Sequence, residues 1–429
     1  MQKSILLLPL TLLTLSATAQ QKSMPDYKRV VKKHWSASTK NILQQQTAHN
    51  KTTAAKQRLT ARALYAFDGS AMQLNDSANY IYSSDRGSVF NLTDMFYNDY
   101  EGSTEMQFDS SAHYRLNGPD FALTDGSKIT YNSSNVRQSY VTLSSTPPGS
   151  PLKEVFDNRY TYNSNGTLNT TYSLQLNGSV WDTAGKTTYS YNAQNKVAEE
   201  VVYNKITTGW EEAFKTVYTY DGAGNNTEVM GYEWTGSAWA ENWKDSNTYN
   251  ANNKLSTNTY MEYTGGVWEN VYTDSFGYSS TDYYTYNMSK EWNTDSVKWL
   301  YSSLEERHVG PNGLPDSVYF SQWDDDAQDW MRIMISDWQY NSNDLPINAN
   351  GVLSFMGAEM PIFQFNYYYE YYFDAGVDKR ANATAAIYPN PATDKVTIEW
   401  KNKTPERTVL YVFNNMGQMV VQQNIGVTN

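Results

Sequence analysis

Six tryptophans and three aspartates are the side chains whose type and spacing could bind a ligand in this chain. The aromatic candidates are Trp181, Trp210, Trp239, Trp243, Trp268 and Trp330. Indole rings are large, flat and apolar, so they can stack on a ligand such as a sugar or fill a hydrophobic core. Four of the six, starting at Trp181, recur at one constant spacing, which predicts equivalent positions in a repeated structure.

The acidic candidates are Asp324, Asp326 and Asp329, which directly precede Trp330. Several carboxylate oxygens close together suit a hard cation such as calcium. The glycine and the terminal glutamate of an EF-hand loop are missing from this stretch, which favours a solvated turn. We therefore expect no cofactor, with calcium at this turn as the alternative.

Residues for catalysis are hard to find in this sequence. The absence of cysteine excludes disulfides, a thiol nucleophile and sulfur-ligated metals. The four histidines include no pair with the spacing of a helical zinc site. Glu211–Glu212 and Glu305–Glu306 would alternate between the faces of a strand, so neither is a catalytic pair. The sequence predicts a protein that is not an enzyme, and a glycan-degrading enzyme is the least favoured function.

A second aromatic register runs in step with the tryptophans and indicates the elements that hold them. It consists of Tyr162, Tyr191, Tyr220, Tyr249 and Tyr278, at the same constant spacing. Turn-forming residues follow the first three, at Asn163–Gly166, Asn192–Asn195 and Asp221–Gly224. Looser copies at a slightly longer spacing extend the repeat over residues 131–376, or about eight units.

The segments between turns are rich in Tyr, Thr, Val and Trp, which is typical of β-strands. Trp210, Phe214, Tyr218 and Tyr220 are separated by even numbers, so a regular strand would place them on one face. Each unit is thus predicted to be an antiparallel hairpin with one aromatic face. That face is expected to form the core, with an exposed stacking platform as the alternative.

The predicted fold is all-β, with tandem antiparallel hairpin repeats of about 29–31 residues each. Roughly sixteen strands would make a flat sheet ~75 Å wide, so a long curled, sandwiched or barrel-like sheet is expected. An outer-membrane barrel would also suit strands of this length. However, Glu212 and Glu241 fall on the aromatic face, where an apolar band would be needed. We therefore expect that the chain is not an integral membrane protein.

The N-terminal part divides into three segments. Residues 1–19 carry Lys3, an apolar stretch and Ala17-Thr18-Ala19, as in a secretory signal peptide cleaved after Ala19. Residues 20–62 are basic and predict a flexible leader, and residues 63–130 predict a degenerate β segment. The chain as a whole has a net charge of −12, which argues against binding to nucleic acid.

After a linker at 377–382, residues 383–429 carry two ordered sequence blocks: a Tyr-Pro-Asn-Pro start and an Asn-x-x-Gly-Gln turn. The motif residues are Tyr388, Pro389, Asn390, Pro391, Asp394 and Gly417. This pattern resembles the type A C-terminal sorting domain of the type IX secretion system. The resemblance implies a small β-sandwich, here truncated and poorly exported, and handling by the type IX secretion machinery. It also implies a location outside the cell or on the outer-membrane surface.

The central Tyr-x-Tyr-Asp/Asn-x-x-Gly-Asn phrase resembles the YD repeats of the RHS group, which implies an extracellular β-repeat and no particular functional residue. Together these features predict a secreted or cell-surface β-repeat protein with a structural, adhesion or interaction role. The alternative is a carbohydrate-binding module that uses the repeated Trp and Tyr face. Its partners would be surface polysaccharide or other cell-surface components.

Overall fold

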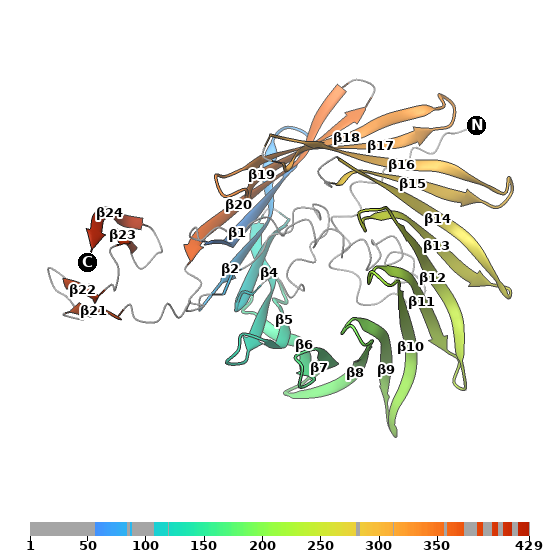
Figure 1. Ribbon diagram of the computed structural model, residues 1–429, viewed down its shortest axis with the longest axis horizontal. Helices are drawn as coiled ribbons and strands as arrows, with labels where there is room; N and C mark the ends of the chain where they lie inside the picture. The colour runs from blue at the N-terminus through green and yellow to red at the C-terminus, as the bar shows by residue number, and fades with distance from the viewer. Residues whose placement is uncertain are drawn as a thin grey trace.

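A computed structural model describes residues 56–83, 86–87, 107–118, 120–279, 284–311, 313–355, 358–372, 384–388, 397–401, 406–413 and 419–428. One antiparallel sheet of 20 strands contains most of them. Its first strand, β1 (Lys56–Phe67), pairs with β2 (Met72–Ile81) on one side and with β20 (Ala358–Tyr372) on the other. The sheet therefore closes into a barrel, which appears as a ring of strands in Figure 1.

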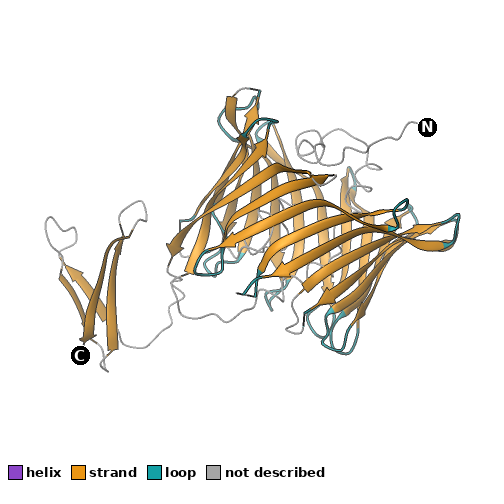
Figure 2. Cartoon of the chain, turned by 90° about the horizontal axis from the view of Figure 1, so that it is seen from above, coloured by secondary structure: helices purple, strands orange, loops and turns teal. Residues whose placement is uncertain are grey.

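The strands between β2 and β20 follow one another around the barrel in chain order, and Figure 2 shows them side by side with hairpin turns at both rims. They are β3 (Ser110–Asn117), β4 (Asp120–Tyr131), β5 (Arg137–Ser144), β6 (Lys153–Tyr162), β7 (Leu168–Asn177), β8 (Val180–Tyr191), β9 (Val197–Ile206), β10 (Gly209–Tyr220), β11 (Asn226–Trp234), β12 (Trp239–Tyr249), β13 (Leu255–Thr264), β14 (Val267–Tyr278), β15 (Tyr284–Asn293), β16 (Lys298–Val309), β17 (Pro315–Asp324), β18 (Asp329–Tyr340) and β19 (Pro346–Phe355).

The predicted antiparallel hairpin repeat in a barrel-like sheet is confirmed. The barrel contains 20 strands rather than about sixteen, because β1 to β4 join the same sheet. β1 begins at Lys56, inside the segment that the sequence assigned to the basic leader. Among the residues described, no helix is long and apolar enough to cross a membrane.

Four short strands follow the barrel in the chain. β21 (Thr384–Tyr388) pairs with β22 (Thr397–Lys401), and β23 (Glu406–Phe413) pairs with β24 (Met419–Thr428). Tyr388 ends β21, whereas the other sorting-motif residues lie outside the described residues: Pro389, Asn390, Pro391, Asp394 and Gly417.

The turns predicted from the Asn/Asp motifs occupy equivalent places along the barrel. In Asp221–Gly224, the backbone N–H of Gly224 donates to the carbonyl of Asp221 at 3.0 Å. Gly166, Asn195 and Gly224 end their turns with left-handed φ angles of 86°, 57° and 84°, which glycine and asparagine tolerate best. The sequence prediction for these three turns is confirmed.

The regular tyrosine period has a structural cause. The hydroxyl of Tyr220 donates to the carbonyl of Val197 at 2.8 Å, joining the end of β10 to the start of β9. The same bond, at 2.5–2.9 Å and spanning 23 or 25 residues, is made by Tyr82, Tyr131, Tyr162, Tyr191, Tyr249, Tyr278, Tyr340 and Tyr369. The tyrosines therefore close the open ends of the hairpins.

Tyr220→Phe should lower the free energy of unfolding by about 0.5–1.5 kcal/mol, because it removes one such hydrogen bond and keeps the ring. Urea unfolding measures the change. Tyr203→Phe is the matched control. The ring of Tyr203 lies against Lys186 on the opposite face of the sheet, and its hydroxyl makes no hydrogen bond with another described residue. An equal loss in both variants would contradict the role of the hydroxyl.

The expectation that the tryptophans and tyrosines share one face is wrong. In β10 the pairing register shifts between Glu212 and Phe214, so Ala213 is the extra residue of a β-bulge. One added residue reverses the side-chain alternation, which turns Trp210 to the face opposite Phe214. Equivalent shifts occur in the hairpins β7–β8, β11–β12, β13–β14, β15–β16 and β17–β18. The sheet therefore has a tyrosine face and a tryptophan face.

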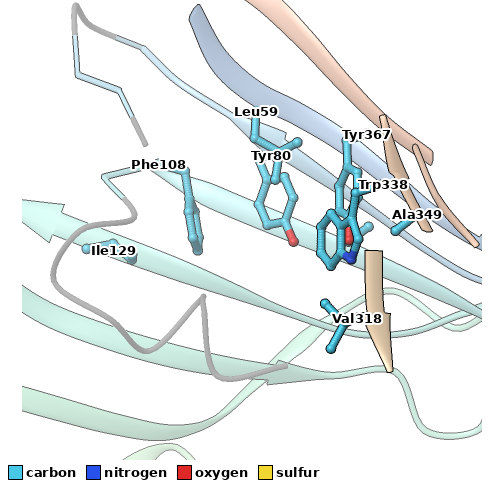
Figure 3. Close-up of a cluster of buried hydrophobic side chains, with 9 residues drawn as sticks. Leu59, Tyr80, Phe108, Ile129, Val318, Trp338, Ala349 and Tyr367 are labelled. Atoms are coloured by element: carbon cyan, nitrogen blue, oxygen red, sulfur yellow. The ribbon is translucent and has the colours of Figure 1, made fainter. Parts of the chain in front are cut away.

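The tyrosine face carries the buried core. Leu59, Leu255, Asn258 and Tyr284 on this face are almost completely buried. One cluster of packed apolar side chains, shown in Figure 3, joins Leu59, Tyr80, Phe108, Ile129, Val318, Trp338, Ala349 and Tyr367. Side chains converge on the inner side of a closed sheet, so we assign the tyrosine face to the barrel interior.

Candidate functional site

The tryptophan face presents a row of indole rings beside the hairpin turns of one rim. We call this row the tryptophan belt. In three hairpins two of its rings pair directly across the strands, with centroids 5.2 Å apart for Trp234–Trp239, 5.0 Å for Trp292–Trp299 and 5.2 Å for Trp323–Trp330. The belt comprises Trp181, Trp210, Trp234, Trp239, Trp268, Trp292, Trp299, Trp323 and Trp330.

Five of the six predicted tryptophans belong to this belt, and each of the six is half-buried. The rings are therefore not in the buried core, which was the favoured expectation. They are not fully exposed either. Trp210, Trp239, Trp268 and Trp330 each pack edge-to-face or tilted against a neighbouring ring, as Trp330 does on Trp323 at 5.2 Å. Such a row keeps part of each ring open for contact while its geometry is fixed by its neighbours.

Lysines connect successive rings of the belt, and sequence reasoning missed them. Lys186, Lys215 and Lys244 recur at the repeat period, and each places its ammonium group over the tryptophan of the next hairpin. The Nζ-to-ring distances are 4.9 Å to Trp210, 4.9 Å to Trp239 and 4.5 Å to Trp268. The period that they share with the tryptophans was the signal that could have identified them.

Polar groups lie among the rings of the belt. Glu212 and Glu241 share the tryptophan face, as the sequence indicated, because each precedes the bulge of its strand. The amide of Asn242, the bulge residue of β12, instead donates at 2.9 Å to Glu233, which pairs with Phe214 on the tyrosine face. The belt thus combines apolar rings with ammonium and carboxylate groups, which suits a polar ligand with flat apolar faces.

Trp243 is the predicted tryptophan that lies apart from the belt. It faces the barrel interior, where it stacks on Tyr260 with centroids 6.2 Å apart, and Tyr260 stacks on Tyr272 at 5.1 Å. The ring covers Gly231 on the neighbouring strand, directly across from it. Glycine at that position allows the close approach of the indole.

Gly231→Ala should destabilise the barrel by about 1–3 kcal/mol, because the new methyl group would lie 2.1 Å from Nε1 of Trp243. The ring must then leave its stack on Tyr260, which is visible in the near-UV circular dichroism. Gly222→Ala provides the control, since nothing lies within 4 Å of a methyl group there. Equal stability of the two variants would show that Trp243 does not need the glycine.

The aspartate cluster forms a turn. Oδ1 of Asp324 accepts hydrogen bonds from the backbone N–H groups of Asp326 and Ala327 at 2.9 and 3.1 Å. Oδ1 of Asp329 accepts one from the N–H of Trp330 at 2.7 Å. Within the described part of the chain, no group of three or more His, Cys, Asp or Glu residues could hold a metal ion. The carboxylates of Asp324 and Asp329 therefore serve as acceptors within the turn.

A set of acids on the tyrosine face was also missed from the sequence. Asp245, Asp274 and Glu305 recur at or close to the repeat period. Burial, offset in part by a hydrogen bond from Asn258, raises the pKa of Asp245 to about 7, and nearby Asp274 adds to the increase. Burial likewise raises the pKa of Asp274 to about 6. The interior of β12 and β14 thus holds two acids whose pKa values lie well above that of an ordinary aspartate.

Comparison with protein families identifies one region of the chain. Residues 386–429 match the secretion system C-terminal sorting domain, which supports the resemblance drawn from the Tyr388 motif. This domain indicates a secreted or cell-surface protein that is handled by the type IX secretion machinery. No curated protein matches the chain.

Solved structures show only distant similarity. A protein of unknown function from Bacteroides fragilis is 13% identical over 28% of this chain and 87% of its own, with a TM-score of 0.25. A porin-like protein from Bacteroides uniformis is 12% identical over 57% of this chain and 95% of its own, with a TM-score of 0.28. The TcdB2-TccC3-Cdc42 structure is 12% identical over 88% of this chain and 21% of its own, with a TM-score of 0.26.

Proposed function

We propose that this chain is a secreted or surface-held interaction protein that adheres to cell-surface components through the tryptophan belt. The observation that carries the proposal is the row of half-buried rings, repeated from hairpin to hairpin along one rim. Equivalent hairpins are two strands apart, or ~10 Å, so successive rings can contact one extended ligand at several points. Many weak contacts along such a row add up to tight binding.

A carbohydrate-binding module is the second candidate function. It is favoured by the carboxylate of Glu241 and the ammonium group of Lys215, which lie on the same face as the indole ring of Trp239. Sugars offer apolar ring faces and hydroxyl edges, so they suit a surface of this composition. In this case the cell-surface component would be a polysaccharide.

Binding to a glycan array and to intact cells tests both proposals. The probes are the folded chain and the variant Trp239→Ala/Trp268→Ala, which removes two adjacent belt positions. We expect at least a roughly tenfold loss of binding in the variant. Binding to a defined glycan on the array would establish the carbohydrate module. Binding to intact cells but to no glycan on the array would favour adhesion to protein. Unchanged binding by the variant would exclude the belt as the contact surface.

A further inference from the structure

Arginines of this chain show how its tyrosines and acids bind a cation. The guanidinium of Arg307 lies 4.5 Å from the ring centroid of Tyr284, and its Nε donates to Glu305 at 2.6 Å. Arg58 lies 4.3 Å from the ring of Tyr82 and pairs with Glu370 at 2.6 Å. In both places a guanidinium contacts one tyrosine ring and one carboxylate. The carboxylate neutralises its charge, and the aromatic ring makes a cation–π contact with it.

The adjacent part of the tyrosine face has the rings and the acids but no such arginine among the residues described. Asp245 pairs with Tyr260 across β12 and β13, and Tyr260 stacks on Tyr272. Burial raises the pKa of Tyr272, and the nearby charges of Asp245 and Asp274 add to the increase. Asn258 donates to Asp245 at 3.2 Å and Ser289 donates to Asp274. Neither acid forms an ion pair with Lys, Arg or His in the described part of the chain. Two acids are therefore held in the interior without a counter-ion, which is costly when they ionise.

Two polar groups next to Asp274 also have unmet hydrogen-bonding capacity. The hydroxyl of Tyr284 and Oδ1 of Asn287 are buried and have no hydrogen-bond partner within the described ranges. Tyr284 is 1% exposed, and the charges of Asp274 and Glu305 both act on its hydroxyl. Asn287 lies between these acids in the sheet, since it pairs with Phe276 of β14 and with Glu305 of β16. Unsatisfied buried acceptors beside acids are suited to a bound N–H donor.

Exposed residues of the same face adjoin this region on the side of the tryptophan rim. Glu291 and Ser303 lie on that face of β15 and β16, nearer the rim, and both are exposed. Glu291 thus adds a solvent-exposed carboxylate beside the buried acids. A cationic side chain that approaches from this side meets the charge of Glu291 first.

We propose that the interior face of β12 to β16 binds a basic polypeptide by taking up an arginine side chain between Asp274, Asn287 and Asp245. The guanidinium would donate hydrogen bonds to the carboxylate of Asp274 and to Oδ1 of Asn287, and would lie against the ring of Tyr272. This site is separate from the tryptophan belt, and its occupant differs in chemistry from a glycan.

Calorimetric titration of the folded chain with a hexa-arginine peptide at about pH 8 tests the site, because Asp245 is then ionised. We expect saturable binding that weakens at least roughly tenfold in Asp274→Asn and in Asp245→Asn. Both substitutions remove a buried charge and keep the shape, so the variants should fold. Tyr284→Phe should weaken binding by roughly fivefold through the lost hydroxyl alone.

Asp325→Asn and Asp120→Asn are the controls, since each removes one exposed charge, in the turn before β18 and at the start of β4. They should bind the peptide as the unmodified chain does. The proposal would be overturned by no binding of the peptide to the unmodified chain, or by an equal loss in the controls and in Asp274→Asn. It would also be overturned if the unmodified chain bound calcium chloride but not the peptide, and if that heat of binding were lost in Asp274→Asn.

Discussion

Asp76→Ala is expected to lower the free energy of unfolding of the barrel by about 3–5 kcal/mol. The carboxylate of Asp76 on β2 lies 3.4 Å from the Arg62 guanidinium of β1 and 3.0 Å from Nε of Arg115 on β3. Arg62 is 6% exposed, so removal of this carboxylate takes an ion-pair partner from a charged group in the interior. The cost falls on β1, which is the strand that closes the sheet.

Urea unfolding of Asp76→Ala, monitored by circular dichroism, measures this cost. Asp120→Ala is the matched control, because Asp120 is exposed at the start of β4. The control should change the stability by less than about 0.5 kcal/mol. A loss of less than about 1 kcal/mol in the free energy of unfolding of Asp76→Ala would contradict this account. It would show that the Asp76–Arg62 ion pair does not stabilise the pairing of β1 with β2 that closes the barrel.

Asp245→Asn is expected to raise the free energy of unfolding by about 2–4 kcal/mol at pH 8. Burial raises the pKa of Asp245 in the folded barrel from the ordinary 3.8 to about 7. For an acid whose folded pKa is raised, the stability it contributes is fully present below about pH 4 and is lost as the pH rises through about 7. The amide removes the ionisation and can still accept the hydrogen bond from Asn258.

The pH dependence distinguishes this cause from a general effect of the substitution. At pH 4 the variant and the unmodified chain should be equally stable to within about 1 kcal/mol, and the difference should grow between about pH 5 and 8. Asp325→Asn, in the exposed turn before β18, should show no such growth. A difference that is independent of pH would contradict ionisation of a buried Asp245.

Most of the fold could be predicted because one unit of structure repeats in the sequence. Tyr220, with the turn at Asp221–Gly224, marks the end of one strand and the start of the next, and equivalent tyrosines mark most later units, with Val309 in this place at the end of β16. The number of such units exceeds what an open twisted sheet accommodates, which predicted curling. The hydroxyl bond from Tyr220 to Val197 explains why this residue recurs at a fixed spacing.

The position of the tryptophans could not be predicted from spacing. Trp210 and Phe214 differ by an even number, but Ala213 is a bulge and reverses the alternation. A bulge depends on how two strands pair, and nothing in the residues around Ala213 marks it. The closing strand escaped recognition for a related reason, since β1 has no Tyr-x-Tyr motif and its arginines read as leader charges.

The interior acids were recognisable in principle. Asp245 and Asp274 follow the repeat period, but they are far apart in the chain, and a search for neighbouring acids draws attention to Glu211–Glu212 instead. Only the pairing of β12, β13 and β14 brings them to the same face, two strands apart with β13 between them. The lysines of the belt were hidden in the same way, by a period longer than any local motif.

Paired measurements on Trp239→Ala test the proposed use of the tryptophan belt most directly. One measurement is the free energy of unfolding, and the other is binding to the surface component found on cells or on a glycan array. Trp239 is half-buried and rests on Trp234 and Lys215. We predict a stability loss of about 1 kcal/mol together with at least a roughly tenfold loss of binding. A stability loss of about 3–5 kcal/mol with unchanged binding would show instead that the ring is core and that the ligand is bound elsewhere.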